Sequence, residues 1–173
     1  DLPGAAVALD LDTADKGVAV EQRIDVIAPA ALGGGHEHLV AIVEAEQAFE
    51  PRAVAAEIGG EAITCNVASR ADVQALRDGA GPVDILVNNA GVTHLPAATE
   101  TVAEEDFDRI FAVNMKAIYL TTQAFVPGFK ARGRGVILNI ASTAGVSPRP
   151  RLSWYNASKG WVITATRSLA VEL

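Results

Sequence analysis

Three things are scarce in this sequence: cysteine, basic charge and long apolar runs. Cys65 is the single cysteine, so no internal disulfide and no set of thiolate metal ligands can form, which suits a reducing cytoplasm. The net charge of −7 comes without a basic cluster and argues against a nucleic-acid partner. No stretch approaches the ~18 apolar residues of a membrane-spanning helix, and the N-terminal residues show no signal-peptide pattern. We therefore expect a cytoplasmic protein that binds neither nucleic acid nor membrane.

Histidine is also scarce, and its placement predicts no metal site. His36 and His38 lie two positions apart, so they would diverge on a helix, and no third ligand lies nearby. His94 follows a polar turn and fits either a plain loop position or the wall of a substrate cleft. Apolar side chains are abundant, since half of the 173 residues are hydrophobic and a fifth are charged. This composition predicts one globular domain with a sizeable core.

From residue 50 onward, segments with helical and strand patterns alternate. The expected helices cover 51–58, 69–76, 101–127 and 153–173, and the expected strands cover 62–67, 83–87 and 135–142. The strands are apolar on both faces, which predicts a parallel sheet with helices on each side. In such sheets ligands bind beyond the carboxyl ends of the strands. The motifs "NNAG" (88–91) and "NIAS" (139–142) stand at two such ends.

Local signals set the expected helix boundaries. Ser69 with Asp72, and Thr101 with Glu104, have the spacing of N-terminal capping pairs, and Pro127 is expected to end the long helix. The first fifty residues are less regular. Strands are expected at 4–12 and 23–30, followed by a helix over 39–49.

The stretch "YNASK" (155–159) places Tyr155 and Lys159 four residues apart, on one face of the expected last helix. Taken alone, such a pair is more often a surface contact. The phenol of tyrosine ordinarily has a pKa of ~10, and an ammonium group close by favours the phenolate. A tyrosine in this setting can exchange a proton with a substrate hydroxyl or carbonyl group.

Four motifs in order resemble the classical short-chain dehydrogenase/reductase family: "NNAG", Asn114 in "FAVNMKA", Ser142 in "NIAS", and "YNASK". The resemblance covers residues ~50–173. Within the family, the chain is similar to the sugar or polyol dehydrogenases and the 3-oxoacyl-carrier-protein reductases. The resemblance implies an α/β fold with a Rossmann-like doubly wound parallel sheet, helices on both faces, and an incomplete C-terminal end. We expect a single domain over 1–173, with an atypical cofactor-side segment (1–50) and a catalytic core (51–173).

The resemblance implies a role for each motif residue. Tyr155 would be the acid/base, Ser142 would hydrogen-bond the substrate oxygen, Lys159 would bind the nicotinamide ribose, and Asn114 would hold a water for proton relay. The cofactor would be NAD or NADP. Its expected contacts are Asn66, Val67, Asn88, Ala90, Gly91, Tyr155 and Lys159.

The sequence departs from the family pattern on the cofactor side. The loop T-G-x-x-x-G-x-G, which lays the pyrophosphate on a helix N-terminus, is absent, and "GGG" at 33–35 is the nearest candidate. Asp10 or Asp12 would be the acid that binds the adenosine ribose, although this segment precedes the glycines. These departures leave a fragment and a rearranged member both open.

The leading hypothesis is an NAD(P)-dependent oxidoreductase that interconverts a secondary alcohol and a ketone. A non-catalytic binding or oligomerisation module and an epimerase or dehydratase are the alternatives. By analogy with the family we expect a homo-oligomer, a tetramer or dimer, formed through the helices that bear Asn114 and Tyr155.

Overall fold

The computed structural model describes residues 24–29, 39–44, 51–57 and 59–173. Five strands form one sheet: β1 (Ile24–Pro29), β2 (Leu39–Glu44), β3 (Gly60–Cys65), β4 (Ile85–Asn88) and β5 (Val136–Asn139). The α-helices are α1 (Pro51–Glu57), α2 (Arg70–Ala80), α3 (Glu104–Ile110), α4 (Ala117–Arg132) and α5 (Ser153–Glu172). A π-helical segment, η2 (Phe111–Lys116), joins α3 to α4, and two 3₁₀ turns are η1 (Thr99–Thr101) and η3 (Thr143–Gly145).

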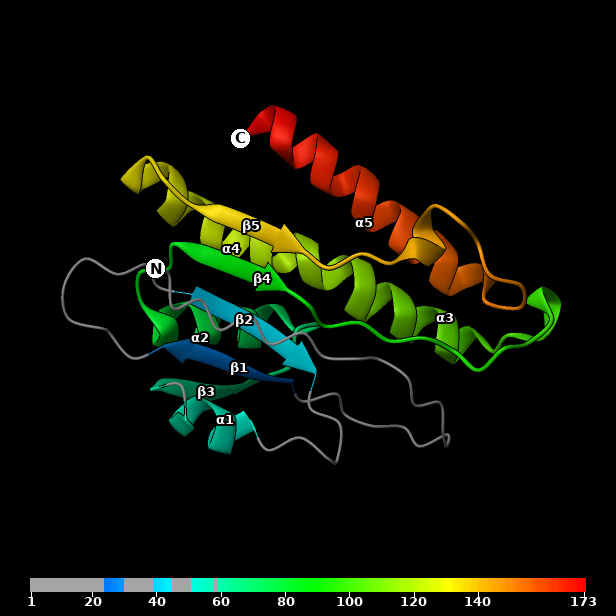
Figure 1. Ribbon diagram of the computed structural model, residues 1–173, viewed down its shortest axis with the longest axis horizontal. Helices are drawn as coiled ribbons and strands as arrows, with labels where there is room; N and C mark the ends of the chain where they lie inside the picture. The colour runs from blue at the N-terminus through cyan, green and yellow to red at the C-terminus, as the bar shows by residue number, and fades with distance from the viewer. Residues whose placement is uncertain (1–23, 30–38, 45–50, 58) are drawn as a thin grey trace.

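The sheet has the strand order β3-β1-β2-β4-β5 (Figure 1). Strands β2, β4 and β5 are mutually parallel, which was expected for β4 and β5, and the expected parallel sheet does not extend to β1. Strand β1 is antiparallel to both of its neighbours, β2 and β3, so β3 runs in the same direction as β2. The chain between β1, which ends at Pro29, and β2, which begins at Leu39, is nine residues long. A parallel crossover needs about a dozen residues or more, so this connection favours the antiparallel pairing of β1.

The helix expected over 39–49 is wrong, because Leu39–Glu44 forms strand β2. The run "LVAIVE" is short and contains three β-branched residues, and periodicity alone does not distinguish a buried strand from a helix at this length. Pairing with β1 on one side and β4 on the other decides for the strand. The strand expected at 23–30 is confirmed as β1, whereas the strand expected at 4–12 lies outside the described residues.

The N-terminus of helix α2 follows its sequence signal. Ser69 is the N-cap, and its hydroxyl accepts a hydrogen bond from the backbone N–H of Asp72 at 3.3 Å. The helix extends past the expected end to Ala80 and packs against β3 and α4. Gly81 ends it with a φ of 66°.

The long helix expected over 101–127 is three segments, α3, η2 and α4. Thr101 does not cap it: Thr101 lies in η1 and donates its hydroxyl hydrogen to the carbonyl of Ala98 at 2.9 Å. Ala103 takes the N-cap position without a side-chain bond, and three acidic side chains in the first turn favour the helix N-terminus instead.

Pro127 does not end the helix either, because α4 continues through it to Arg132. Proline removes one backbone hydrogen bond from the helix. The buried side chains of Phe125 and Phe129 lie on either side of it, and their packing outweighs that loss. Gly133 then ends the helix in the left-handed conformation, with φ 66°.

The core lies between α2, α4 and strand β4, which has a neighbour on each side in the sheet. Leu86 of β4 is fully buried, and the cluster around it includes Val73, Leu76, Ile110, Leu120 and Phe125. On β5 only Ile137 packs against this core, whereas Val136 and Leu138 on its other face are 56% and 50% exposed. None of the helices in the described ranges is long and apolar enough to cross a membrane.

Candidate active site

Strands β3, β4 and β5 run in the same direction, so their carboxyl ends share one edge of the sheet. "NNAG" follows β4 at this edge, and Ser142 follows β5. Helix α5 packs against the η3 turn that follows Ser142, and it carries Tyr155 and Lys159 in its first two turns (Figure 1). The predicted catalytic residues therefore gather at the edge that the sequence indicated.

Asn114 lies in the π-helical segment and is only 1% exposed. Its side-chain Oδ1 accepts from the backbone N–H of Val92 at 2.8 Å, and its Nδ2 donates to the Val92 carbonyl at 2.9 Å. The same Nδ2 donates to Ser158 Oγ at 2.9 Å, and Ser158 Oγ donates to the carbonyl of Tyr155 at 2.7 Å. Asn114 thus ties the segment after β4 to the first turn of α5. Such π-helical insertions are frequent at functional sites.

Ser158 is a residue that sequence reasoning missed. It is 1% exposed and joins Asn114 to Tyr155. Its signal was its place inside "YNASK", one residue before the lysine.

Lys159 is buried, with 5% of its surface exposed. Its Nζ donates to the carbonyl oxygen of Ile140 at 3.0 Å and lies 6.0 Å from the centroid of the Tyr155 ring. The carbonyl of Ile140 comes just past the end of β5, so the sheet itself holds the ammonium group beside the tyrosine. Charges interact more strongly in such a partly desolvated place than in water.

Ser142 is the N-cap of η3, with an extended backbone (φ −152°, ψ 153°). Its Oγ accepts from the backbone N–H of Ala144 at 3.1 Å. A hydroxyl that accepts one bond still carries its own hydrogen to donate, which is what binding of a carbonyl oxygen requires. The structure brings Ser142 to α5 through the packing of η3 on that helix.

The side chain of Asn88 takes part in a hydrogen-bond chain within the protein. Its Nδ2 donates to Asn139 Oδ1 at 2.8 Å, and its Oδ1 accepts from Thr121 Oγ1 at 2.9 Å. Asn139 Nδ2 in turn donates to Thr166 Oγ1 at 2.9 Å. This chain of bonds connects α4, β4, β5 and α5 at the catalytic edge. Asn88 was predicted as a cofactor contact, and its amide here fixes the strands that carry the site.

The other predicted residues of "NNAG" are Ala90 and Gly91. Ala90 is partly buried against the core, and Gly91 lies beside Lys159. A Cβ built at Gly91 would stand 3.1 Å from Lys159 Nζ.

Asn66 and Val67 follow β3 at the same edge, and strands β1 and β2 lie between β3 and β4. Val67 is 1% exposed and belongs to the core. Asn66 Oδ1 accepts from the N–H of Ala68 at 3.0 Å, which closes a tight turn. The structure therefore separates these two residues from the Tyr155 group by the width of two strands.

Cys65 is buried in the core, as the sequence suggested for it. Burial, with a smaller contribution from the negative charge of Asp72, raises the pKa of its thiol to about 12. A thiol in this state is a poor nucleophile.

Several expectations fall on residues that the structure does not describe. These are the glycines 33–35, Asp10, Asp12, His36 and His38. Within the described ranges, no group of three or more His, Cys, Asp or Glu side chains could hold a metal ion.

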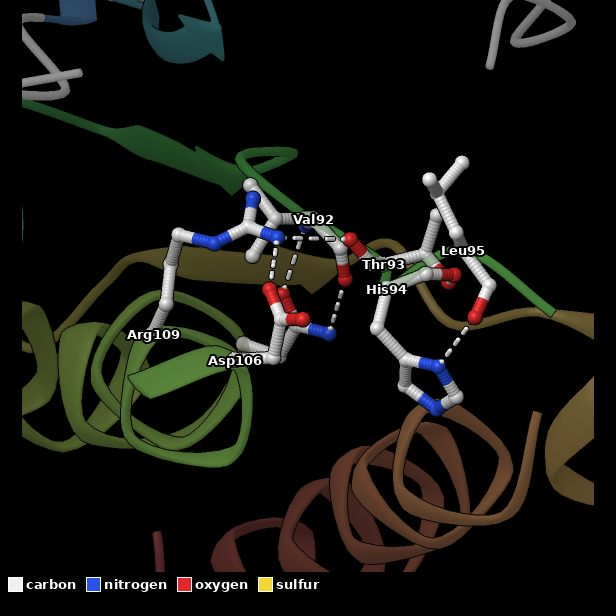
Figure 2. Close-up of polar contacts among 7 residues, drawn as sticks. Val92, Thr93, His94, Leu95, Asp106 and Arg109 are labelled. Carbon is white, nitrogen blue, oxygen red and sulfur yellow. Dashed lines mark hydrogen bonds and ion pairs between the residues drawn. The ribbon is translucent and has the colours of Figure 1, made fainter. Parts of the chain in front are cut away.

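The segment after "NNAG" is held by a second set of polar contacts (Figure 2). Arg109 Nη2 donates to the carbonyl of Thr93 at 3.0 Å and pairs with Asp106 at 2.8 Å. His94 is 2% exposed, and its Nδ1 lies 2.8 Å from the carbonyl oxygen of Leu95. Its Nε2 has no hydrogen-bond partner among the described residues. The sequence pattern around His94 does not predict that this side chain is buried.

Comparison with known proteins identifies the fold and the arrangement of motifs. The family model described as "short chain dehydrogenase" matches residues 27–173. Among curated proteins, 4-formylbenzenesulfonate dehydrogenase of Comamonas testosteroni is 43% identical over 114 residues, which cover 64% of this chain and 45% of that protein. The chain spans about half the length of the curated relatives it matches.

Solved structures agree with this match. A 3-ketoacyl-(acyl-carrier-protein) reductase from Brucella melitensis, complexed with NADH, is 49% identical and has a TM-score of 0.62, covering 64% of this chain and 49% of that one. A metagenomic short-chain oxidoreductase in complex with NADP is 35% identical with a TM-score of 0.66, covering 71% of this chain and 58% of that one. The α/β architecture is that of these Rossmann-fold proteins.

Proposed function

Since the chain belongs to the short-chain dehydrogenase family, we propose that it is an oxidoreductase that interconverts a secondary alcohol and a ketone with NAD or NADP. One observation carries the proposal. Tyr155 and Lys159 lie on one helix, and Asn114 is bonded through Ser158 to the backbone of that helix's first turn. The motifs that the family shares are therefore assembled at one edge of the sheet.

The bound cofactor would supply or accept the hydride, and the chain would handle the proton. In reduction, Tyr155 donates its phenolic proton to the substrate oxygen, and in oxidation it takes that proton back. Lys159 keeps a positive charge beside the phenol, which favours the phenolate after transfer. Ser142 donates a hydrogen bond to the same substrate oxygen and stabilises the charge that develops on it.

The donor set fits the nicotinamide end of such a cofactor. An ammonium group and two hydroxyls at the carboxyl edge have the chemistry to bind ribose hydroxyls and a substrate oxygen. We assign Gly91, Ala90, Tyr155 and Lys159 to this end, and Asn66 and Val67 to the adenine end. Asn88 would act by holding β4 in place. The candidate for phosphate binding, "GGG" at 33–35, lies outside the described part of the chain.

We also propose that the protein is a homo-oligomer, a tetramer or dimer, in the cytoplasm. The segments α3, η2 and α4 around Asn114 expose large aromatic side chains: Phe107 is 42% exposed, Phe111 46% and Tyr119 46%. Phe107 and Trp154 join the two helices in an edge-to-face contact with ring centroids 5.4 Å apart. Exposed aromatic groups of this kind favour association. The single buried cysteine suits a reducing compartment.

Calorimetric titration of this chain with NADH and with NADPH tests the proposal. We expect binding of at least one of them, and a Lys159→Met variant should bind it about tenfold more weakly because a charge-assisted hydrogen bond is lost. A module that only binds partners or oligomerises would bind neither cofactor. An epimerase or dehydratase would bind the cofactor without net change in its redox state, so absorbance of NADH during turnover separates that alternative.

A further inference from the structure

We propose that Gly91 and Gly145 are positioning residues that together fix Lys159 next to Tyr155. The two glycines, called here the glycine slot, come from the segments that follow β4 and β5 and flank the lysine from both sides. The inference rests on the proposed function, in which Tyr155 donates the proton and Lys159 supports it. It gives both glycines a part in the reaction that acts through the position of Lys159.

Gly145 approaches the backbone of the lysine. A Cβ built at Gly145 would stand 2.7 Å from the Lys159 carbonyl carbon, and 2.8 Å from both the Lys159 oxygen and the Gly160 nitrogen. These distances are far inside van der Waals contact, and the atoms met are backbone atoms that no side-chain rotation can move. The φ of Gly145 lies outside the left-handed region, so space alone requires glycine here.

Gly91 approaches the charged tip of the same residue. A Cβ there would stand 3.1 Å from Lys159 Nζ and 3.7 Å from both Lys159 Cε and Asn114 Oδ1. The ammonium group is already anchored to the Ile140 carbonyl at 3.0 Å. A methyl group at position 91 would therefore push the tip by a few tenths of an ångström against that hydrogen bond.

The two contacts have different consequences. Adding a methyl group at Gly145 must separate η3 from α5, and Ser142, three residues earlier on the same turn, moves with it. Adding one at Gly91 displaces only the flexible end of Lys159. Because the reaction depends on the position of the groups around the reacting oxygen, either change should lower kcat, more so at Gly145.

Packing alone is the competing explanation, in which these glycines only allow the fold to close. It predicts lower stability with no change in the proton chemistry of the folded protein. Measuring kcat together with stability on the same variants separates the two explanations.

The test measures kcat with a panel of ketones at saturating NADH or NADPH in the wild type, in Gly145→Ala and in Gly91→Ala. The melting temperature and the calorimetric affinity for the same cofactor are measured on each protein. We expect kcat to fall about tenfold or more in Gly145→Ala and by less in Gly91→Ala, whose melting temperature should stay close to that of the wild type.

Gly160→Ala is the matched control from the other side of the same contact. Its added Cβ would lie 3.4 Å from the Gly145 oxygen, an ordinary contact, so its kcat should equal that of the wild type. If Gly145→Ala does not fold, Gly91→Ala still decides, because it disturbs only a side-chain tip. An unchanged kcat in the folded Gly91→Ala protein, or an equal loss of kcat in Gly160→Ala, would overturn the proposal.

The failure of this proposal is distinguishable from failure of the proposed function. Absence of NADH and NADPH binding and of turnover in the wild type would overturn the proposed function, and the glycine slot with it. Turnover in the wild type with an unchanged kcat in both slot variants would overturn the glycine slot alone.

Discussion

The part of the chain from residue 59 onward and the two N-terminal strands differ in how they are built. Beyond residue 59, strands and helices alternate, and β4 and β5 are parallel and joined by a hydrogen bond between Asn88 and Asn139. In the N-terminal part, β1 lies antiparallel between β3 and β2, and the connection that follows it to β2 is too short for a parallel crossover. The residues proposed for catalysis all belong to the first region. The difference teaches that the predicted site residues come together where parallel strands end, whereas the N-terminal strands depart from the parallel arrangement.

The sharpest contrast within the first region is between neighbouring strands. Leu86 of β4 is fully buried, so Leu86→Ala should lower the free energy of unfolding by about 2–5 kcal/mol through lost packing and a cavity. Leu138 of β5 is 50% exposed and serves as the control, with an expected loss of under about 1 kcal/mol. Urea denaturation measures both, and similar losses at the two positions would contradict the placement of the core.

The hydrogen-bond chain across β4 and β5 should be the next most sensitive feature. Asn139→Ala leaves both Asn88 Nδ2 and Thr166 Oγ1 without this partner, with an expected cost of about 1–3 kcal/mol. Thr166→Val keeps the bond between Asn88 and Asn139. It removes the outer bond and the bond from Thr166 Oγ1 to the Val162 carbonyl within α5, and it should cost less. Equal effects of the two variants in urea denaturation would show that the inner bond carries no special weight.

A substitution in strand β1 tests whether the N-terminal strands affect cofactor binding without affecting the residues proposed for catalysis. Val26 pairs with Ile42 of β2 and Ile63 of β3, so Val26→Pro removes a backbone donor inside the sheet. We expect affinity for NADH, measured by calorimetry, to fall about tenfold, equal to about 1.4 kcal/mol, with kcat at saturating NADH unchanged. Val26→Ala keeps the N–H and is the control. A lower kcat in the proline variant would mean that the regions are coupled.

Cys65 gives the smallest effect, because it has no part in the chemistry. With a thiol pKa of about 12, the folded protein should react with iodoacetamide at pH 8 far more slowly than the protein in urea. The raised pKa also means that the unfolded state loses its thiol proton first, so this contribution to stability is full below pH 9 and lost as pH rises from 9 toward 12. Equal alkylation rates in the two states would contradict burial.

Much of the catalytic region could be predicted from sequence because its signals are local. Ser69 and Asp72 cap α2 as expected, and "YNASK" falls on α5. The motif order was sufficient to assign the edge of the sheet where Ser142 lies.

The errors came from effects that sequence does not contain. The sequence predicts a helix that includes Leu39–Glu44 because "LVAIVE" is compatible with a helix and with a buried strand. Pairing with β1 on one side and β4 on the other makes it strand β2. Pro127 lies inside α4 because buried phenylalanines on both sides outweigh one missing hydrogen bond. The bridge formed by Ser158 and the close approach of Gly145 depend on the packing of segments far apart in the chain.

The central claim is that Tyr155 transfers the proton in a dehydrogenase reaction. The most direct test compares wild type with Tyr155→Phe in oxidation of NADH or NADPH with a panel of ketones, alongside calorimetric binding of the same cofactor. We predict that kcat falls by about 10²–10⁴ while cofactor affinity and the melting temperature stay close to the wild-type values. Undiminished turnover in a folded, cofactor-binding Tyr155→Phe protein would contradict the account.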